Sequence, residues 1–234
     1  MTTKLKEVDL VVCLDSSACE TTRLWMTGSL RGIVNCDLTV KMLNDPVHSG
    51  DAGGIVPETF RICRHLLNRL DSPKDGSMIE EFNVKIPESR IKEAKELSSL
   101  FGKLAYSHYP WLPGTLPVTE DVTELLLNRT WRPCLAVTGA DGLPEISKAG
   151  NVLRISTSLK LSIRLPPTLK SEPTGLKVKE ILEKDPPYGA EVKVSNVVCA
   201  DGWNANDYPP KFHELISNAS KVFDLVNKIE YLQK

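Results

Sequence analysis

The sequence has 234 residues, of which 41% are apolar and 25% are charged, a composition typical of a globular protein with a substantial core. Its 29 Lys and Arg against 30 Asp and Glu leave a formal net charge of −1, which argues against nucleic acid or an anionic membrane as a partner. The sequence lacks a run of about 18 apolar residues, and its first apolar stretch is too short for a signal peptide. We therefore expect a cytoplasmic protein.

The cysteines are scattered along the chain without a CxxC pair, which argues against a zinc knuckle and against a disulfide framework. We expect most of them to be buried thiols. They are Cys13, Cys19, Cys36, Cys63, Cys134 and Cys199.

The first predicted elements are two strands of different kinds. The opening "EVDLVVCLDSS" is a continuous apolar run that ends at Asp15, as in a strand buried on both faces of an α/β sheet. Residues 33–42 alternate between apolar and polar, which predicts a strand with one solvent-exposed face. Between this strand and the next helix lies the loop "NDPVHSGDAGG", which holds His48 among small residues.

Helical spacing follows this loop. Pro57 is a plausible first helical position, and apolar residues over 60–70 repeat at helical spacing. A second helix is predicted over 91–104, and a third after Thr119, which we expect to be its N-cap. The stretch "YPWLPGTLP" between them predicts a loop.

The second half begins with "CLAVTGADG", a strand that enters a turn. Alternation over 158–165 and in "EVKVSN" predicts two more strands, separated by a helix that starts near Thr174 and stops before Pro186. The last apolar set, over 212–229, predicts an amphipathic helix.

The order strand, helix, strand, strand, helix, strand from Ile33 to about Val198 predicts an α+β fold, a ferredoxin-like βαββαβ two-layer sandwich with extra helices inserted. A sheet with one exposed face does not continue the buried opening strand. We therefore predict one domain over residues 29–200, flanked by segments 1–28 and 201–234 that belong to an α/β structure.

Four stretches match a known family in content, order and spacing: "VVCLDSS", "SLRGIVNCDLTVKMLNDPVHSGDAGG", "GADGLPEISKAGNVL" and "LKLSIRLPP", with "GWNANDYPP" as a weaker fifth. The chain resembles the di-zinc exopeptidase and deacylase family, which includes carnosine dipeptidase, cytosolic non-specific dipeptidase, acetylornithine deacetylase and glutamate carboxypeptidases. In that family a ferredoxin-like lid interrupts a catalytic domain with two zinc ions and forms the homodimer. The resemblance implies that residues 29–200 are the lid and dimerisation domain. The two flanks would be fragments of the catalytic domain, the first with one zinc-ligand strand.

The resemblance assigns roles to four residues. Asp15 matches a carboxylate ligand to one zinc ion, and carboxylate oxygen suits that metal. His48 matches the lid histidine that, in dimeric members, reaches into the partner subunit's active site and helps hold the polarised carbonyl oxygen. Arg164 matches the arginine that binds the free carboxylate of the substrate, and Asn151 matches a substrate-contacting position near the same pocket.

Each of these residues also has a simpler structural interpretation, and the sequence alone leaves these alternatives open. Asp15 can bond a nearby turn, and His48 can cap a turn or bond Asp51. Arg164 lies on the polar face of its strand and can simply be solvated, while Asn151 can belong to a turn.

Most zinc ligands of the family have no match. The family also needs a His-x-Asp pair, a bridging Asp, an adjacent Glu-Glu pair and a late histidine, and this sequence has no His-x-Asp. Glu80-Glu81 lies inside the predicted lid instead of before Asp15. The remaining histidines lack metal-ligand spacing: His65, His108 and His213. Two zinc ions per complete enzyme are implied by the resemblance, but we expect this chain alone to be an incomplete, inactive hydrolase.

Three functions remain open. The preferred one is a fragment of a zinc dipeptidase or carboxypeptidase that hydrolyses an amide next to a free carboxylate, in a peptide or N-acyl amino acid, and dimerises through the lid. The second is a non-catalytic binding or assembly subunit of peptidase descent. The third is a regulatory module for an amino-acid-like ligand. Two lids could pair through the edge of an alternating strand such as residues 34–43.

Overall fold

The computed structural model describes residues 24–206, 208–222 and 229–233. The chain divides into two compact units, and the larger one comprises Ser29–Ala205. The described parts of the smaller unit come before and after this range. None of the helices in the described ranges has the length and apolar content needed to cross a bilayer. The predicted opening strand, with Asp15, lies outside the described residues.

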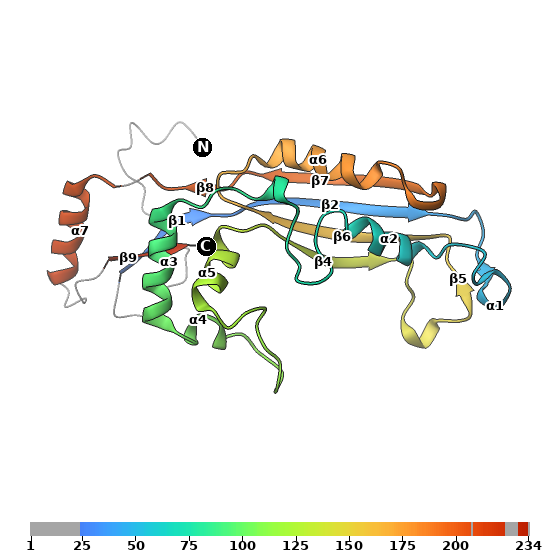
Figure 1. Cartoon of the computed structure of the whole chain (residues 1–234), viewed down its shortest axis with the longest axis horizontal. Coiled ribbons are helices and arrows are strands. Elements are labelled where there is room, and N and C mark those ends of the chain that lie inside the picture. The colour runs from blue at the N-terminus through green and yellow to red at the C-terminus, as the bar shows by residue number, and fades with distance from the viewer. Residues whose placement is uncertain (1–23, 207, 223–228, 234) are drawn as a thin grey trace, which may run out of the picture. The chain divides into compact units, whose positions relative to one another are not determined.

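A four-stranded antiparallel sheet forms the centre of the larger unit (Figure 1). Its strands, in spatial order, are β4 (Cys134–Asp141), β6 (Ser156–Leu165), β2 (Gly32–Lys41) and β7 (Glu191–Ala200). β2 pairs with β6 along its whole length, from Gly32 opposite Leu165 to Lys41 opposite Ser156. β2 is therefore a central strand, so the suggestion that residues 34–43 could form a free edge is wrong, and β4 and β7 are the two edges.

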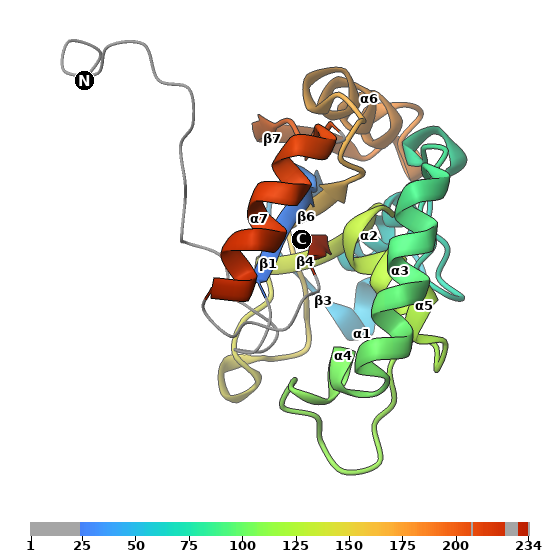
Figure 2. The same ribbon diagram turned by 90° about the vertical axis from the view of Figure 1, so that its left-hand side faces the viewer.

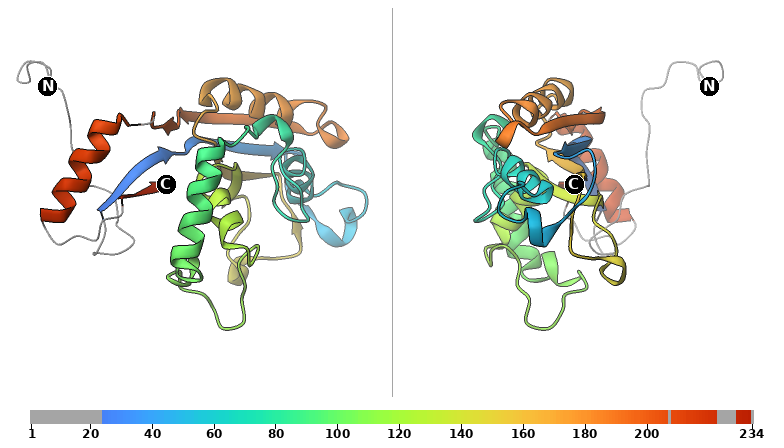
Figure 3. Two further views of the ribbon diagram at one scale, coloured as in Figure 1. Left: turned by 60° about the vertical axis from the view of Figure 1, so that its left-hand side comes forward. Right: turned by 90° about the vertical axis from the view of Figure 1, so that its right-hand side faces the viewer.

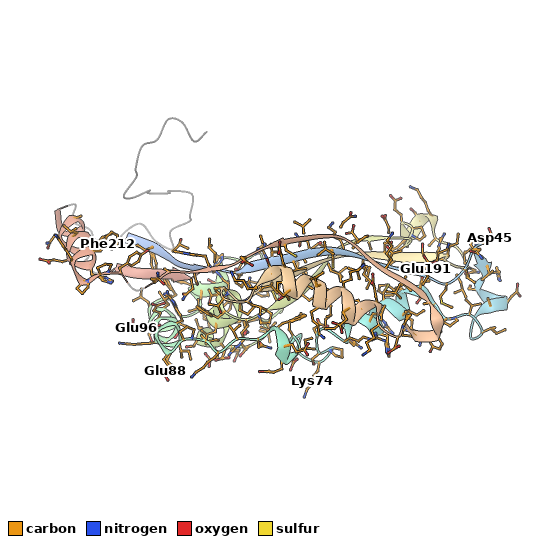
Figure 4. The ribbon with its side chains drawn as sticks, turned by 90° about the horizontal axis from the view of Figure 1, so that it is seen from above. Asp45, Lys74, Glu88, Glu96, Glu191 and Phe212 are labelled. Carbon is orange, nitrogen blue, oxygen red and sulfur yellow. The ribbon has the colours of Figure 1, made fainter. Side chains whose placement is uncertain are left out.

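Two helices cover one face of this sheet: α2 (Thr59–Leu67) and α6 (Ser171–Glu183). Figure 4 shows α6 and Lys74 on the same side of the long strands. The alternation of β2 and β6 points every second, apolar side chain toward the helices, and a fully buried leucine contributes about 2 kcal/mol relative to an exposed one. This core includes Val34, Cys36, Leu38, Val40, Leu159, Leu161, Ile163 and Leu165 from the sheet, and Ile62, Leu66, Val178 and Leu182 from the helices.

Three helices are inserted between α2 and β4: α3 (Glu88–Phe101), α4 (Leu104–Ser107) and α5 (Val122–Thr130). α3 and α5 lie side by side (Figure 2). The N-cap of α5 is Asp121 and not Thr119, because the Asp121 carboxylate accepts hydrogen bonds from the N–H groups of Thr123 and Glu124. The Thr119 hydroxyl accepts from the N–H of Asp121 one step earlier.

At one end of the sheet, residues 44–56 and 142–155 form what we call the tip (Figures 1 and 3). It contains β3 (Val47–His48), α1 (Ser49–Ala52), η2 (Ile146–Lys148) and β5 (Val152–Leu153). β3 and β5 are antiparallel, with Val47 opposite Leu153 and His48 opposite Val152. The turn at Gly142, with φ of 82°, requires glycine because a Cβ there would lie 2.2 Å from the carbonyl oxygen of Ser156.

The remaining elements are β1 (Leu24–Leu30), β8 (Trp203–Asn204), α7 (Pro210–Val222) and β9 (Ile229–Gln233). β1 pairs with β8 through Ser29 and Leu30, and the order of this three-stranded sheet is β8-β1-β9. The predicted helix over 212–229 is wrong at its end, because α7 stops at Val222 and Ile229 begins a strand. The described part of the chain is therefore a mixed α/β structure with antiparallel sheets.

The carboxylate of Asp201, the residue after β7, accepts hydrogen bonds from the start of α6. Asp201 accepts hydrogen bonds from the Ser171 N–H and hydroxyl, each at 2.8 Å, and from the Lys170 ammonium at 2.8 Å. The bond from Lys170 and those from Ser171 hold the pKa of the Asp201 carboxyl well below its usual range. Asp201 is therefore ionised in the folded chain at acidities where an unfolded chain would bind a proton.

We expect this carboxylate to make stability depend on pH. A lowered folded-state pKa gives stabilisation that is fully present above a pH of about 4 and is lost as the pH falls below that value. Asp201→Asn should be less stable than the wild type at pH 7, and the difference should shrink at pH 3. Urea unfolding at both pH values measures this, with the exposed Asp45→Asn as control. If the wild type and Asp201→Asn differ in stability by the same amount at pH 7 and at pH 3, the Asp201 carboxylate does not cause this pH dependence.

Candidate functional site

His48 ends β3 and caps α1. Its Nδ1 accepts a hydrogen bond from the Gly50 N–H at 3.1 Å, so a neutral ring carries its proton on Nε2. The side chain is 60% exposed, and Nδ1 lies 3.9 Å from Asp51. A Cβ at residue 50 would lie 2.9 Å from Cε1 of His48, so glycine lets the ring take this position. The capping alternative is therefore real, but it occupies one nitrogen and leaves Nε2–H free to donate.

Asn151 lies beside His48 on the tip. Its carbonyl oxygen accepts a hydrogen bond from the Ser49 N–H at 2.9 Å, and the next residue, Val152, pairs with His48. The Asn151 side chain is exposed. The structure thus brings these two predicted residues together at one end of the sheet.

Arg164 lies near the opposite end of the sheet. It stands on β6 between Ile33 of β2 and Cys134 of β4, and its side chain is exposed on the face that α2 and α6 leave open, since its neighbours Ile163 and Leu165 are buried on the other face. Strand rise places Arg164 about 26 Å from Ser156, where β6 meets the tip. Within one chain, Arg164 therefore does not come together with His48 and Asn151.

Sequence reasoning missed Arg31, which is next to the Arg164 end. Its guanidinium donates to the carbonyl oxygens of Asn128 and Arg132 and to the Sγ of Cys134, and Cys134 pairs with Arg164. A cavity of about 430 Å³ opens beside Arg31, walled by aromatic and apolar side chains from α4, α5 and the loop between them. These include Tyr106, Tyr109, Trp111, Leu125 and Leu126. Only the fold shows this neighbourhood, because these wall residues, from Tyr106 to Leu126, lie 75 to 95 positions after Arg31 in the sequence.

Polar pairs connect the strands on the open face between these two ends. Asp37 forms an ion pair with Lys160 at 2.9 Å and accepts a hydrogen bond from the Asn196 amide at 2.6 Å. The bonds from Asn196 and then Lys160 lower the pKa of Asp37. Asn196 has a φ of 51° at an irregularity in the β2–β7 pairing. These contacts fix the strands, and none of them involves Arg164, whose guanidinium has neither an ion pair nor a side-chain hydrogen bond within the described ranges.

The described residues do not supply a zinc site. They contain no group of three or more His, Cys, Asp or Glu side chains that could hold a metal. Glu80 and Glu81 are exposed in η1 (Glu80–Phe82), and His65 is exposed on α2. His108 lies against Tyr109 with ring centroids 4.1 Å apart, and His213 contacts Tyr208 edge-on. The described side chains therefore do not fit the two-zinc centre that the resemblance implies, and Asp15 is not among them.

Comparisons with known proteins point to one group of peptidases, although no protein-family model matches the chain. A curated cysteinylglycine-S-conjugate dipeptidase from Corynebacterium striatum is 25% identical over 171 residues, which is 73% of this chain and 36% of that protein. The chain thus spans little more than a third of this curated relative.

Solved structures share the fold. The Saccharomyces cerevisiae di-peptidase Dug1p superposes with a TM-score of 0.68 at 19% identity, over 91% of this chain and 46% of its own. Human carnosine dipeptidase 1 superposes with a TM-score of 0.67 at 21% identity, over 91% of this chain and 45% of its own. The M20 family metallo-carboxypeptidase Sso-CP2 from Sulfolobus solfataricus superposes with a TM-score of 0.65 at 14% identity, over 91% of this chain and 53% of its own. The resemblance to the di-zinc exopeptidase family is confirmed: the chain has a dipeptidase among its curated relatives and the fold of about half of an M20-type peptidase.

Proposed function

We propose that the chain is part of a metallopeptidase of the dipeptidase or carboxypeptidase type and supplies its lid. The relatives are named as dipeptidases and a carboxypeptidase. The strand order β4-β6-β2-β7, with α2 and α6 on one face, supports a ferredoxin-like lid over residues 29–200. The substrate would be a peptide or an N-acyl amino acid, in which an amide lies next to a free carboxylate.

The observation that carries this proposal is the placement of the donors at two ends of one sheet. The exposed Arg164 guanidinium is suited to a bidentate pair with the substrate carboxylate. At the other end, His48 Nε2–H can donate to the oxygen of a polarised carbonyl, with the Asn151 amide beside it. A dipeptide is about 7 Å long, so one substrate cannot reach both ends of the same lid. Two copies of the chain are needed, arranged so that the tip of one lies near Arg164 of the other.

The β4 edge offers this arrangement, and the β7 edge is protected. At β7, the Val194 N–H donates to the Glu183 carboxylate at 2.7 Å, and the Val194 carbonyl accepts from the Lys179 ammonium at 3.0 Å. Side chains of α6 thus occupy both backbone groups of Val194, which a new strand paired there would need. No described side chain does this at β4, where residues 136–141 are exposed.

Antiparallel pairing of two β4 strands around a two-fold axis would place the start of one beside the end of the other. Cys134 at the start of β4 pairs with Arg164, and Asp141 at its end leads into the tip. The tip of the second copy would then lie about two strand spacings, or about 10 Å, from Arg164. A homodimer of this kind would complete a site from Arg164 of one copy and His48 and Asn151 of the other.

Zinc is part of the proposal only for the complete enzyme. The resemblance gives Asp15 as one ligand, and the described residues provide no others, so we assign no catalytic step to a metal here. The lack of a group of metal ligands among the described residues also favours a second candidate function, that of a non-catalytic binding subunit of peptidase descent.

Zinc content and ligand binding test both candidates. We expect the purified chain, dialysed against metal-free buffer, to hold less than about 0.1 zinc per chain, to bind N-acetyl-L-alanine and to leave Ala-Ala unhydrolysed even with added zinc. Two firmly bound zinc ions with hydrolysis would show that the chain itself completes the metal centre. If neither N-acetyl-L-alanine nor a dipeptide binds, the proposal of a substrate-binding lid fails.

A further inference from the structure

A groove of about 630 Å³ lies between α2 and the turn that follows α6. It is on the helix-covered side of the four-stranded sheet, whereas Arg164 is on the open face. One side of the groove is α2, and the other is η3 (Pro187–Gly189) with the nearby Pro73. The polar side chains that line it are Arg61, Arg64, His65, Asn68, Asp71 and Tyr188.

The groove concentrates positive charge that the chain does not neutralise. Within the described ranges, the side chains of Arg61, Arg64 and His65 are exposed and have neither an ion pair nor a hydrogen bond. The single carboxylate in the lining is Asp71, and burial raises its pKa. The whole chain has a formal net charge of −1, so this cluster does not reflect a basic protein.

Helix electrostatics account for only part of the cluster. Arg64 and His65 lie in the last turn of α2, where positive charge interacts favourably with the helix dipole. Arg61 is the third residue of the same helix, where the N-cap carboxylate of Glu58 accepts a hydrogen bond from the Arg61 N–H at 2.7 Å and offsets the helix dipole. Arg61 also lies three residues from Arg64, the spacing at which like charges repel across a helix face. A bound anion would relieve this repulsion.

The opposite wall is held in place and is strained. The Arg69 guanidinium donates to the carbonyl oxygens of Ile181, Lys184 and Asp185, which ties the turn after α6 to the end of α2. In this turn Asp185 has a φ of 40° and Tyr188 a φ of 58°, a left-handed conformation that is unusual for a bulky side chain. Tyr188 is 70% exposed, so burial of its ring does not offset this strain.

We propose that this groove binds a small polyanion, a molecule with two or more phosphate or carboxylate groups close together. Two guanidinium forks and the His65 ring of α2 supply donors, together with the amide of its C-cap residue Asn68, and the Tyr188 hydroxyl supplies another from the facing turn. The groove volume of about 630 Å³ is that of a small-molecule site. This site is independent of the proposed peptidase function, because it uses none of the residues assigned to that function.

Isothermal titration of the full chain with sodium pyrophosphate and, separately, with sodium citrate, at constant ionic strength, tests the proposal. We expect saturable binding of one anion per chain. Tighter binding of pyrophosphate would identify phosphate as the preferred group, and tighter binding of citrate would identify carboxylate. The double variant Arg61→Gln/Arg64→Gln should raise the Kd at least tenfold. The control Lys95→Gln/Lys103→Gln, which removes two positive charges at and just after α3, should change it less than twofold.

Tyr188→Asn provides a second test that does not depend on charge. Asparagine tolerates the left-handed conformation, so this variant should melt at a higher temperature than the wild type while binding pyrophosphate or citrate more weakly. No saturable binding of either anion would overturn the proposal. Equal weakening by the Arg61/Arg64 and Lys95/Lys103 variants would also overturn it, since binding would then follow overall charge.

Discussion

Arg164→Gln should raise the Kd for N-acetyl-L-alanine about tenfold to a hundredfold, because the variant loses charged hydrogen bonds to the ligand carboxylate. The change should be small for N-acetyl-L-alanine amide, which has no carboxylate to bind. Arg164 is exposed, lies on a rigid central strand and has no ion pair among the described side chains, so the substitution should leave stability nearly unchanged. NMR titration of both ligands with wild type and variant measures the four affinities.

A charge-matched control is Lys74→Gln, which removes one exposed positive charge on the helix-covered side of the sheet. It should leave both affinities within twofold of the wild type. If N-acetyl-L-alanine amide binds the wild type as tightly as N-acetyl-L-alanine does, Arg164 does not bind the ligand carboxylate. Arg164 is then only a solvated side chain on the open face. The simpler structural interpretation of the sequence would then be correct for this residue.

Alternation along single strands made much of the fold predictable. Residues 33–42 and 158–165 carry their apolar side chains at every second position, and these are the side chains buried under α2 and α6. Local chemistry also predicted that His48 could cap a turn, which its bond with Gly50 confirms. The helical spacing over 212–229 predicted too long a helix, because the β-branched Ile229, which also suits a strand, begins β9.

Non-local features could not be predicted from single residues. His48 and Arg164 lie at opposite ends of the sheet because of the pairing between β2 and β6, and no local pattern encodes that register. The protection of β7 depends on Lys179 and Glu183 of α6 reaching Val194, which only the packed helix allows. The basic groove likewise needs α2 and the turn at Tyr188, about 120 residues apart, to face each other. The roles of Asp15, Asn151 and Arg164 came from the family resemblance, and they stay predictions.

Val137→Lys should weaken dimerisation about thirtyfold, because antiparallel pairing of two β4 strands would bring the two new ammonium groups close to each other near the two-fold axis. Val137 is 47% exposed at the middle of β4. The matched control is Val198→Lys on β7, where the valine is 60% exposed and the strand is the protected edge. Light scattering over a range of concentrations should find monomers for Val137→Lys where the wild type and Val198→Lys are dimers.

The same variants connect the interface to the ligand site. If His48 and Asn151 act from the second copy, Val137→Lys should weaken binding of N-acetyl-L-alanine by as much as the double variant His48→Ala/Asn151→Ala does, although Val137 touches no ligand. Adding Val137→Lys to that double variant should then have little further effect, because both changes remove the contribution of the second copy. A monomeric wild type, or a Val198→Lys variant that dissociates while Val137→Lys does not, would contradict the β4 interface. Full binding by a monomeric Val137→Lys would instead show that one chain holds the ligand alone, with Arg164 sufficient and His48 only capping α1.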